Sequence, residues 1–204
     1  MKKENIIEEY FEYRDKIGDR TGLYRMVAKK YSITSALYPG SHIDIAPSLV
    51  IPQVRYVDNF RGAIKFFTNI DKIKKHIDEN SEYEEACDIA FIGQDYTGEL
   101  NIAPVDLIIS QFAGFVGQAT KKYLKTGGIL LCNDSHGDAT LAKFDQDFAF
   151  IGVVGTHHRI INTKLNDYFV LPRNKEVDLT KVKEKMKGPT YALTAENYIF
   201  RKIR

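Results

Sequence analysis

The sequence has few cysteines and no pattern that would use them to hold a metal ion. Its 204 residues include only Cys87 and Cys132, both among apolar residues, and they contain neither a C-x-x-C nor an H-E-x-x-H pattern. A free cysteine in apolar surroundings packs as a small hydrophobic side chain. Unpaired cysteines without metal-ligand spacing are typical of reducing compartments. We therefore expect a cytoplasmic protein without a bound metal.

Long apolar runs and an excess of one charge are also missing. The longest apolar runs, at residues 129–132 and 148–154, are far too short to cross a bilayer. The first ten residues alternate charges instead of forming the apolar segment of a signal peptide. The 29 basic and 27 acidic residues leave a net charge of +2, which does not indicate a polyanion partner. We expect neither a membrane nor a nucleic-acid partner.

Apolar residues make up 44% of the sequence, which is enough for the core of one globular domain. Helical spacing of apolar residues predicts helices at residues 6–13, 23–31, 60–80 and 115–124, a short one at 44–50, and a Lys-rich one at 178–187. The apolar face of the 60–80 helix is expected to contain Ile64, Phe67, Ile70, Ile73 and Ile77. Gly127-Gly128 is predicted to end the 115–124 helix, because glycine is common just past a helix. Residues 1–31 are expected to cover the core as a helical cap, or alternatively to close over a substrate as a lid.

Short apolar strands alternate with these helices. They are predicted at residues 33–38, 54–57, 88–92, 106–110, 129–132, 148–154 and 198–202. This alternation is typical of an α/β fold with a mostly parallel sheet and helices on both faces. Residues 32–204 then form the main domain. An insertion at about 155–190, which is predicted to contain a hairpin at 158–171, interrupts the alternation of strands and helices.

Polar residues follow each of the first four strands, where an open α/β sheet binds its ligands. They are Tyr38, Pro39, Gly40 and Ser41 after the first strand, Asp58 and Asn59 after the second, Asp95 and Tyr96 after the third, and Ser110 and Gln111 after the fourth. Gly40 can let the backbone approach a ligand closely. Asp58, eighteen residues later, is placed to accept hydrogen bonds from the two hydroxyls of a ribose, and Asp95 to meet an adenine amino group. As an alternative, each acid caps the helix that follows it.

Segments 35–41, 56–58, 93–96, 106–110 and 124–131 resemble the class I S-adenosylmethionine-dependent methyltransferases, over about residues 32–154. The resemblance implies a three-layer Rossmann-like fold with seven strands, the last antiparallel between two others near residues 197–203. It also implies S-adenosylmethionine as the cofactor, bound by the strand-end residues above. The chain departs from the family in its first loop, which keeps only Gly40 of three spaced glycines and has Ser41 and His42 beside it.

The loop after the fifth strand contains the candidates for catalysis. In methyl transfer the cofactor brings the reactivity and the protein aligns the nucleophile with the methyl group. A nearby base helps to remove the acceptor's proton, and Asp134 and His136 are the candidates for that role. Alternatively, residues 133–135 form only a polar turn that caps the next helix. His157 and His158 either line the acceptor pocket or are simply solvated.

Three functions follow from this pattern. The first is a methyltransferase for a small-molecule acceptor, whose pocket is made by the N-terminal helices and by residues 155–189. The second is a methyltransferase-like binding module that has lost catalysis, which the missing glycines favour. The third is a nicotinamide-dependent oxidoreductase. We rank it last because its phosphate loop also needs those glycines.

Overall fold

The computed structural model describes residues 6–155 and 159–204. By its internal contacts the chain divides into two compact units, Met1–Gly98 and Glu99–Arg204. Strands alternate with helices along both units, so the fold class is α/β, as predicted. The described part of the chain contains no helix long and apolar enough to span a membrane.

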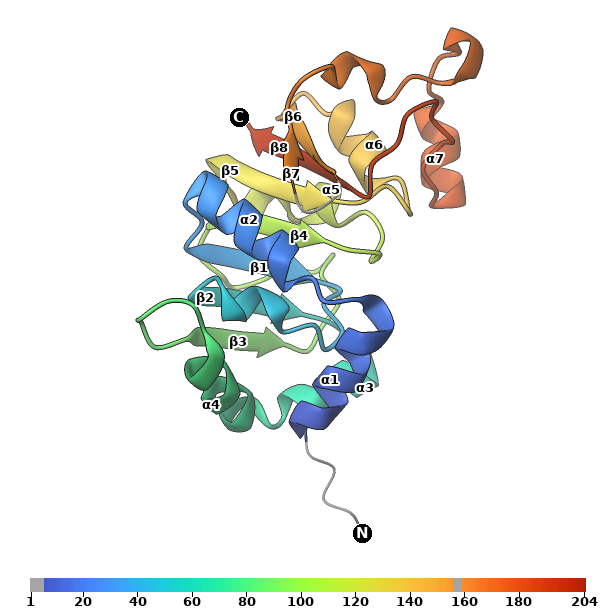
Figure 1. The fold of residues 1–204 in the computed structure, drawn as a ribbon. Coiled ribbons are helices and arrows are strands. Elements are labelled where there is room, and N and C mark those ends of the chain that lie inside the picture. The colour runs from blue at the N-terminus through green and yellow to red at the C-terminus, as the bar shows by residue number, and fades with distance from the viewer. Residues whose placement is uncertain (1–5, 156–158) are drawn as a thin grey trace. The chain divides into compact units, whose positions relative to one another are not determined.

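The first unit contains a three-stranded parallel sheet. Its elements are α1 (Ile6–Ile17), α2 (Thr21–Tyr31), β1 (Ser35–Pro39), the 3-10 helix η1 (Ala46–Leu49), β2 (Gln53–Val57), α3 (Arg61–Phe67), α4 (Ile70–Asn80) and β3 (Asp88–Ile92) (Figure 1). The strand order is β3-β2-β1, and Val57 is in register with both Pro39 and Ile92. The three strands therefore end together, so that the loops after β1, β2 and β3 all begin at one edge of the sheet.

The long helix predicted at residues 60–80 is in fact two helices. The chain breaks at Thr68 and Asn69, where the Thr68 hydroxyl donates a hydrogen bond to the carbonyl of Lys65 at 2.6 Å. Such local side-chain bonds compete with the helical ladder. Ile64, predicted on the apolar face, is 37% exposed. The 44–50 segment is also shorter than predicted, because only η1 forms there.

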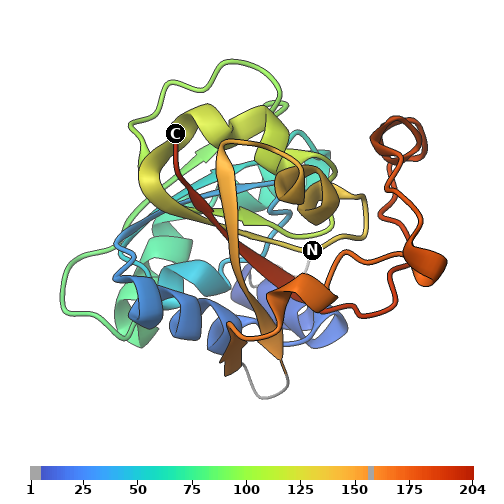
Figure 2. The same cartoon turned by 90° about the horizontal axis from the view of Figure 1, so that it is seen from above.

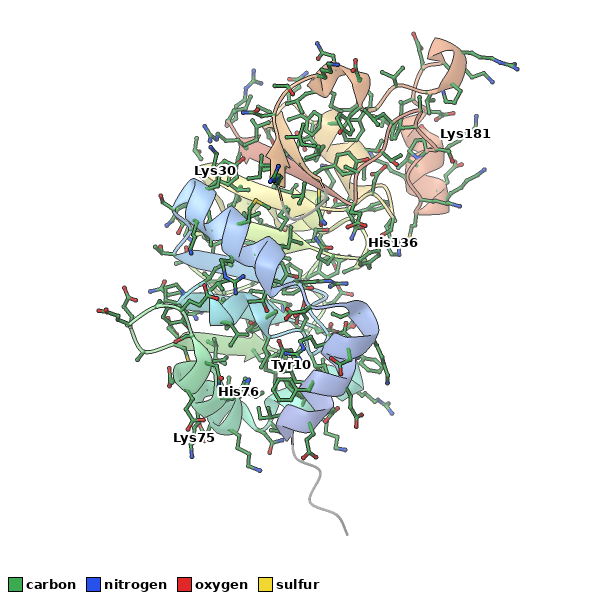
Figure 3. All side chains as sticks on the ribbon, viewed as in Figure 1. Tyr10, Lys30, Lys75, His76, His136 and Lys181 are labelled. Carbon is green, nitrogen blue, oxygen red and sulfur yellow. The ribbon has the colours of Figure 1, made fainter. Side chains whose placement is uncertain are left out.

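Helix α1 packs against α4 through aromatic rings. The Tyr10 ring lies 6.3 Å from the His76 ring, measured between centroids, and the Phe11 ring lies 5.6 Å from it (Figure 3). Tyr10 is completely buried. These contacts fix α1 against α4.

The second unit contains a five-stranded mixed sheet. Its elements are β4 (Val105–Ser110), α5 (Val116–Thr120), η2 (Lys121–Tyr123), β5 (Leu124–Cys132), α6 (Asp138–Lys143), β6 (Phe148–Gly155), β7 (Arg159–Ile161), η4 (Leu165–Asp167), η5 (Pro172–Asn174), α7 (Leu179–Lys185) and β8 (Asn197–Lys202). The strand order is β4-β5-β8-β6-β7. The predicted last strand is confirmed, since β8 runs antiparallel between β5 and β6. The short β7 brings the described strands to eight instead of seven.

Two local predictions in this unit are wrong. Gly127 and Gly128 do not end a helix, because the helical residues stop at Tyr123 and both glycines lie inside β5. They occupy an irregular stretch, where the register with β4 shifts between Val105 and Leu107 and Gly127 has a φ of +86°. The predicted hairpin at 158–171 is also wrong. Residues Arg159–Ile161 pair instead with the end of β6.

Candidate functional site

The loop after β1 turns at Gly40, on the strand edge where the sequence predicts a ligand. The Gly40 N–H donates to the carbonyl of Val57 at 2.7 Å, which ties the turn to the end of β2. Gly40 has a φ of +63°, a left-handed conformation that costs a side-chain-bearing residue energy. Ser41 is buried directly after it. The turn therefore favours glycine at this position.

Asp58, which follows β2, joins the first and second loops. One carboxylate oxygen accepts the backbone N–H of His42 at 2.7 Å, and the other accepts that of Phe60 at 2.8 Å. The residue is 9% exposed. Each oxygen of an ionised carboxylate has two lone pairs, so one remains on each for a further donor. The carboxylate is thus fixed in orientation and can still accept two hydrogen bonds.

His42 is held between two aromatic rings. Its ring lies 4.6 Å from that of Tyr13 in α1 and 5.2 Å from that of Phe60, and both pairs are stacked. Its backbone φ is +49°, and its Nδ1 is buried with no hydrogen-bond partner among the described residues. Burial lowers the pKa of His42, so the ring is neutral near pH 7.

Tyr13 and Phe60 stack on His42 in the candidate site, and neither was predicted from the sequence. Phe60 is 55% exposed, although phenylalanine is usually buried. It stands two positions after Asp58, and an aromatic residue so close to a strand-closing acid is a signal that could have identified it. Tyr13 offers no such signal, because its contact with His42 depends on how α1 packs.

A buried polar network lies beneath this loop. The hydroxyls of Tyr24 and Tyr38 each donate to one carboxylate oxygen of Asp44 at 3.1 Å, and Arg20 lies 3.5 Å from the same oxygen. Burial raises the pKa of Asp44, and the Arg20 charge and these hydrogen bonds oppose that rise. Tyr38, predicted to contact the cofactor, is 1% exposed and its hydroxyl belongs to this network.

The acid after β3 lies beside the residue that follows Asp58. The Asn59 side-chain amide donates to Asp95 at 3.4 Å, so the loops after β2 and β3 meet as predicted from the strand ends. The other Asp95 oxygen accepts from the backbone N–H and the hydroxyl of Thr97, at 2.8 and 2.7 Å. These bonds lower the pKa of Asp95. Asp95 is exposed, and Tyr96 next to it is half-buried.

In the second unit, Ser110 and Gln111 are buried and their side chains are used internally. The Ser110 hydroxyl donates to Asp138 at 2.6 Å, and the Gln111 amide donates to Asn197 at 2.6 Å. Asn133 in turn donates to the Gln111 carbonyl oxygen at 3.2 Å. Burial raises the pKa of Asp138 to about 6. The ends of β4, β5 and β8 are thus joined by a polar network.

The two catalytic candidates after β5 have different surroundings. Asp134 accepts the backbone N–H and the hydroxyl of Thr140, both at 2.7 Å, which caps α6, and burial raises its pKa to about 6. His136 is half-exposed, and its Nδ1 lies 3.0 Å from the Ser135 hydroxyl. The polar turn of residues 133–135 is present, since Asn133 accepts from the backbone N–H of Ser135 at 3.1 Å. His157 and His158 lie outside the described residues. Within residues 6–155 and 159–204 no cluster of side chains could hold a metal ion.

Comparison with known proteins identifies the fold. No protein-family model and no curated protein sequence matches the chain. Among solved structures, the plantazolicin methyltransferase BpumL in complex with SAH is 11% identical over 99% of this chain and 90% of its own, with a TM-score of 0.55. An S-adenosylmethionine-dependent methyltransferase from Clostridium acetobutylicum is 11% identical over 98% of this chain and all of its own, with a TM-score of 0.53. The chain has the class I methyltransferase fold.

Proposed function

We propose that the protein is an S-adenosylmethionine-dependent methyltransferase acting on a small molecule. The observation that carries the proposal is the Asp58 carboxylate, held by the His42 and Phe60 amides at the same sheet edge as Gly40. A carboxylate fixed in this way, with one free lone pair on each oxygen, suits the two neighbouring hydroxyls of a ribose.

The surroundings of Asp58 also suit a nucleoside. Asn59 and Asp95 provide amide and carboxylate groups in the adjoining loops, which match the donors and acceptors on the edge of an adenine. The exposed Phe60 ring offers an apolar surface two residues from Asp58. The left-handed turn at Gly40 lets the backbone come close to a ligand without a Cβ in between.

The roles of the chain's own residues follow from what the cofactor supplies. Bound S-adenosylmethionine would supply a methyl group on a positively charged sulfur. In the second unit we assign His136 the role of the base, because its ring is half-exposed, whereas the Asp134 carboxylate accepts two hydrogen bonds from Thr140 and lies against Gly188. The two cysteines are free and buried, which fits our proposal of a cytoplasmic protein.

A second candidate function is a nucleoside-binding module without catalysis. It is favoured by the His42 ring between Tyr13 and Phe60, in the loop where the family has glycines. A bulky ring in this loop would hinder the methionine part of the cofactor more than the nucleoside part. The two functions therefore predict different ligand preferences.

Calorimetric titration of the full chain with S-adenosylmethionine, SAH, adenosine and NAD distinguishes the candidates. For a methyltransferase we expect SAH to bind at least about tenfold more tightly than adenosine, because the amino-acid chain adds contacts. Equal affinities for SAH and adenosine would support the binding module. Binding of NAD alone would favour the oxidoreductase, and binding of none of the four would reject all three functions.

A further inference from the structure

A projecting segment of the second unit, residues 172–190, is named here the α7 arm. It leaves the sheet after Phe169 and returns at Tyr191, which are both buried and whose ring centroids lie 5.2 Å apart. The Phe169 ring also lies 4.9 Å from that of Tyr198 in β8. Between these two anchors, α7 stands away from β6 and β8 in both views of the ribbon (Figures 1 and 2). The arm is thus a defined excursion with fixed ends.

The α7 arm packs on the loop after β5. Val182 is the buried residue of α7, and a Cβ on Gly137 would overlap its side chain. Gly188 lies against Asp134, whose carboxylate a Cβ at position 188 would also overlap. The arm therefore sits directly on residues 134–137, the loop that contains His136 (Figure 3).

The arm also holds the protein's excess of positive charge. Six basic and three acidic residues lie between positions 172 and 190, a net charge of +3, whereas the whole chain has +2. The rest of the chain is therefore slightly negative. Lys183, Lys185 and Lys187 are exposed, while Lys181 forms an ion pair with Asp178 at 3.0 Å. A concentrated positive field of this kind attracts anions.

The size of the basic surface indicates a small anion. Helix α7 has seven residues and is about 10 Å long at 1.5 Å per residue. A nucleic acid is normally bound by a wider basic face that neutralises many phosphates. Lysine ammonium groups suit phosphate as compact point charges.

We propose that the α7 arm and the adjoining 134–137 loop bind a phosphate group of a small, phosphorylated acceptor. The description of this ligand as the acceptor rests on the proposed function, whereas the anion site itself does not. The arm brings the phosphate to the loop of His136. The positive charge comes from Lys183 in the last turn of α7 and from Lys187, which follows the left-handed residue Met186 just after the helix.

The test is a titration of the isotope-labelled full chain with pyrophosphate, followed by backbone amide NMR. We expect the amide shifts to be confined to residues 134–137 and 179–188. In the double variant Lys183→Glu and Lys187→Glu, the affinity for pyrophosphate should fall about tenfold or more, because two attractions become repulsions. The matched control is Lys72→Glu with Lys75→Glu on the exposed face of α4, which makes the same change of charge and should leave the affinity unchanged.

Several outcomes would overturn the proposal. The first is that pyrophosphate does not bind at concentrations up to about 10 mM. The second is that the amide shifts spread over all lysine-rich regions, and the third is that both double variants lose the same pyrophosphate affinity. A twelve-nucleotide RNA that binds the arm much more tightly than pyrophosphate would replace the small acceptor with nucleic acid. SAH is titrated into the same samples, so a failure of the anion site is distinguished from a failure of the proposed cofactor site. SAH affinity should be the same in both double variants and in the natural chain.

Discussion

Replacing Asp58 by alanine should weaken both the fold and the binding of SAH. The substitution leaves the backbone N–H groups of His42 and Phe60 without their acceptor, at a position that is 9% exposed. A hydrogen bond to a charged group contributes about 1.5–3 kcal/mol. Water can hydrogen-bond to the two amides in part, so the loss of both bonds should lower the free energy of unfolding by about 3 kcal/mol. The ribose loses the same acceptor, and SAH affinity should fall about tenfold or more.

The conservative variant Asp58→Asn separates the two effects. The carbonyl oxygen of the asparagine can still accept a hydrogen bond from one backbone N–H. Its NH2 group is itself a donor, so it faces the other N–H without forming a hydrogen bond. We therefore expect about half of the stability loss of Asp58→Ala, together with a similar loss of SAH affinity. Asp88→Asn is the matched control, because Asp88 lies at the opposite end of β3, where its carboxylate pairs with Arg55 at the surface.

The assays are urea unfolding for stability and calorimetry for SAH, with amide NMR to show that each variant is folded under the binding conditions. A folded Asp58→Ala variant with the affinity of the natural chain would refute the assignment of Asp58 to the ribose. An unchanged free energy of unfolding would refute its role in joining the two loops.

Three further predictions concern the pH response, the first loop and the α7 arm. The pKa of Asp138 is raised to about 6 in the folded state, so its stabilising contribution is complete below the ordinary value of about 4 and is lost as the pH rises through 6. Between pH 5 and pH 8 the free energy of unfolding, measured in urea, should therefore fall by about 1 kcal/mol less for Asp138→Asn than for the natural chain, and an identical fall would contradict the prediction. His42→Gly should relieve about 1 kcal/mol of strain from the left-handed backbone and should remove the stacked ring from the first loop. Calorimetry should then show tighter binding of SAH, whereas weaker binding would mean that the His42 ring contacts the ligand. Gly137→Ala should lower the midpoint temperature of thermal unfolding more than Gly18→Ala. Both glycines have a positive φ, but only a Cβ at position 137 would also overlap the Val182 side chain. Equal shifts of the midpoint would show that the α7 arm moves away from Gly137 at little energetic cost.

The order of strands and the edge that holds the loops could be predicted because both depend on local patterns. The apolar runs that became β1 to β6 stand out against polar neighbours, and a parallel sheet requires their carboxyl ends to meet. The sequence alone therefore predicts that Gly40, Asp58 and Asp95 lie at one edge of the sheet. The errors arose where a local signal has two meanings. A pair of glycines such as Gly127 and Gly128 is typical both of the end of a helix and of an irregular strand.

The contents of the site were less predictable, since they depend on contacts between distant residues. His42 was identified as an obstacle in the first loop, but its two ring partners come from α1 and from the loop after β2. Nothing in the spacing of Tyr13 distinguishes it from the other aromatic residues of that helix. The internal use of Gln111 likewise requires Asn197, which lies near the other end of the second unit's sequence.

The position of β8 has a consequence for how the second unit assembles. It fills the gap between β5 and β6, pairing Leu131 with Ile199 and Phe150 with Phe200. Until residues 197–202 arrive, β5 and one side of β6 have open edges whose backbone groups can pair with another chain. Such pairings between distant parts of a sequence form slowly. We therefore expect self-association to compete with folding until β8 is in place, and refolding to succeed best at low protein concentration.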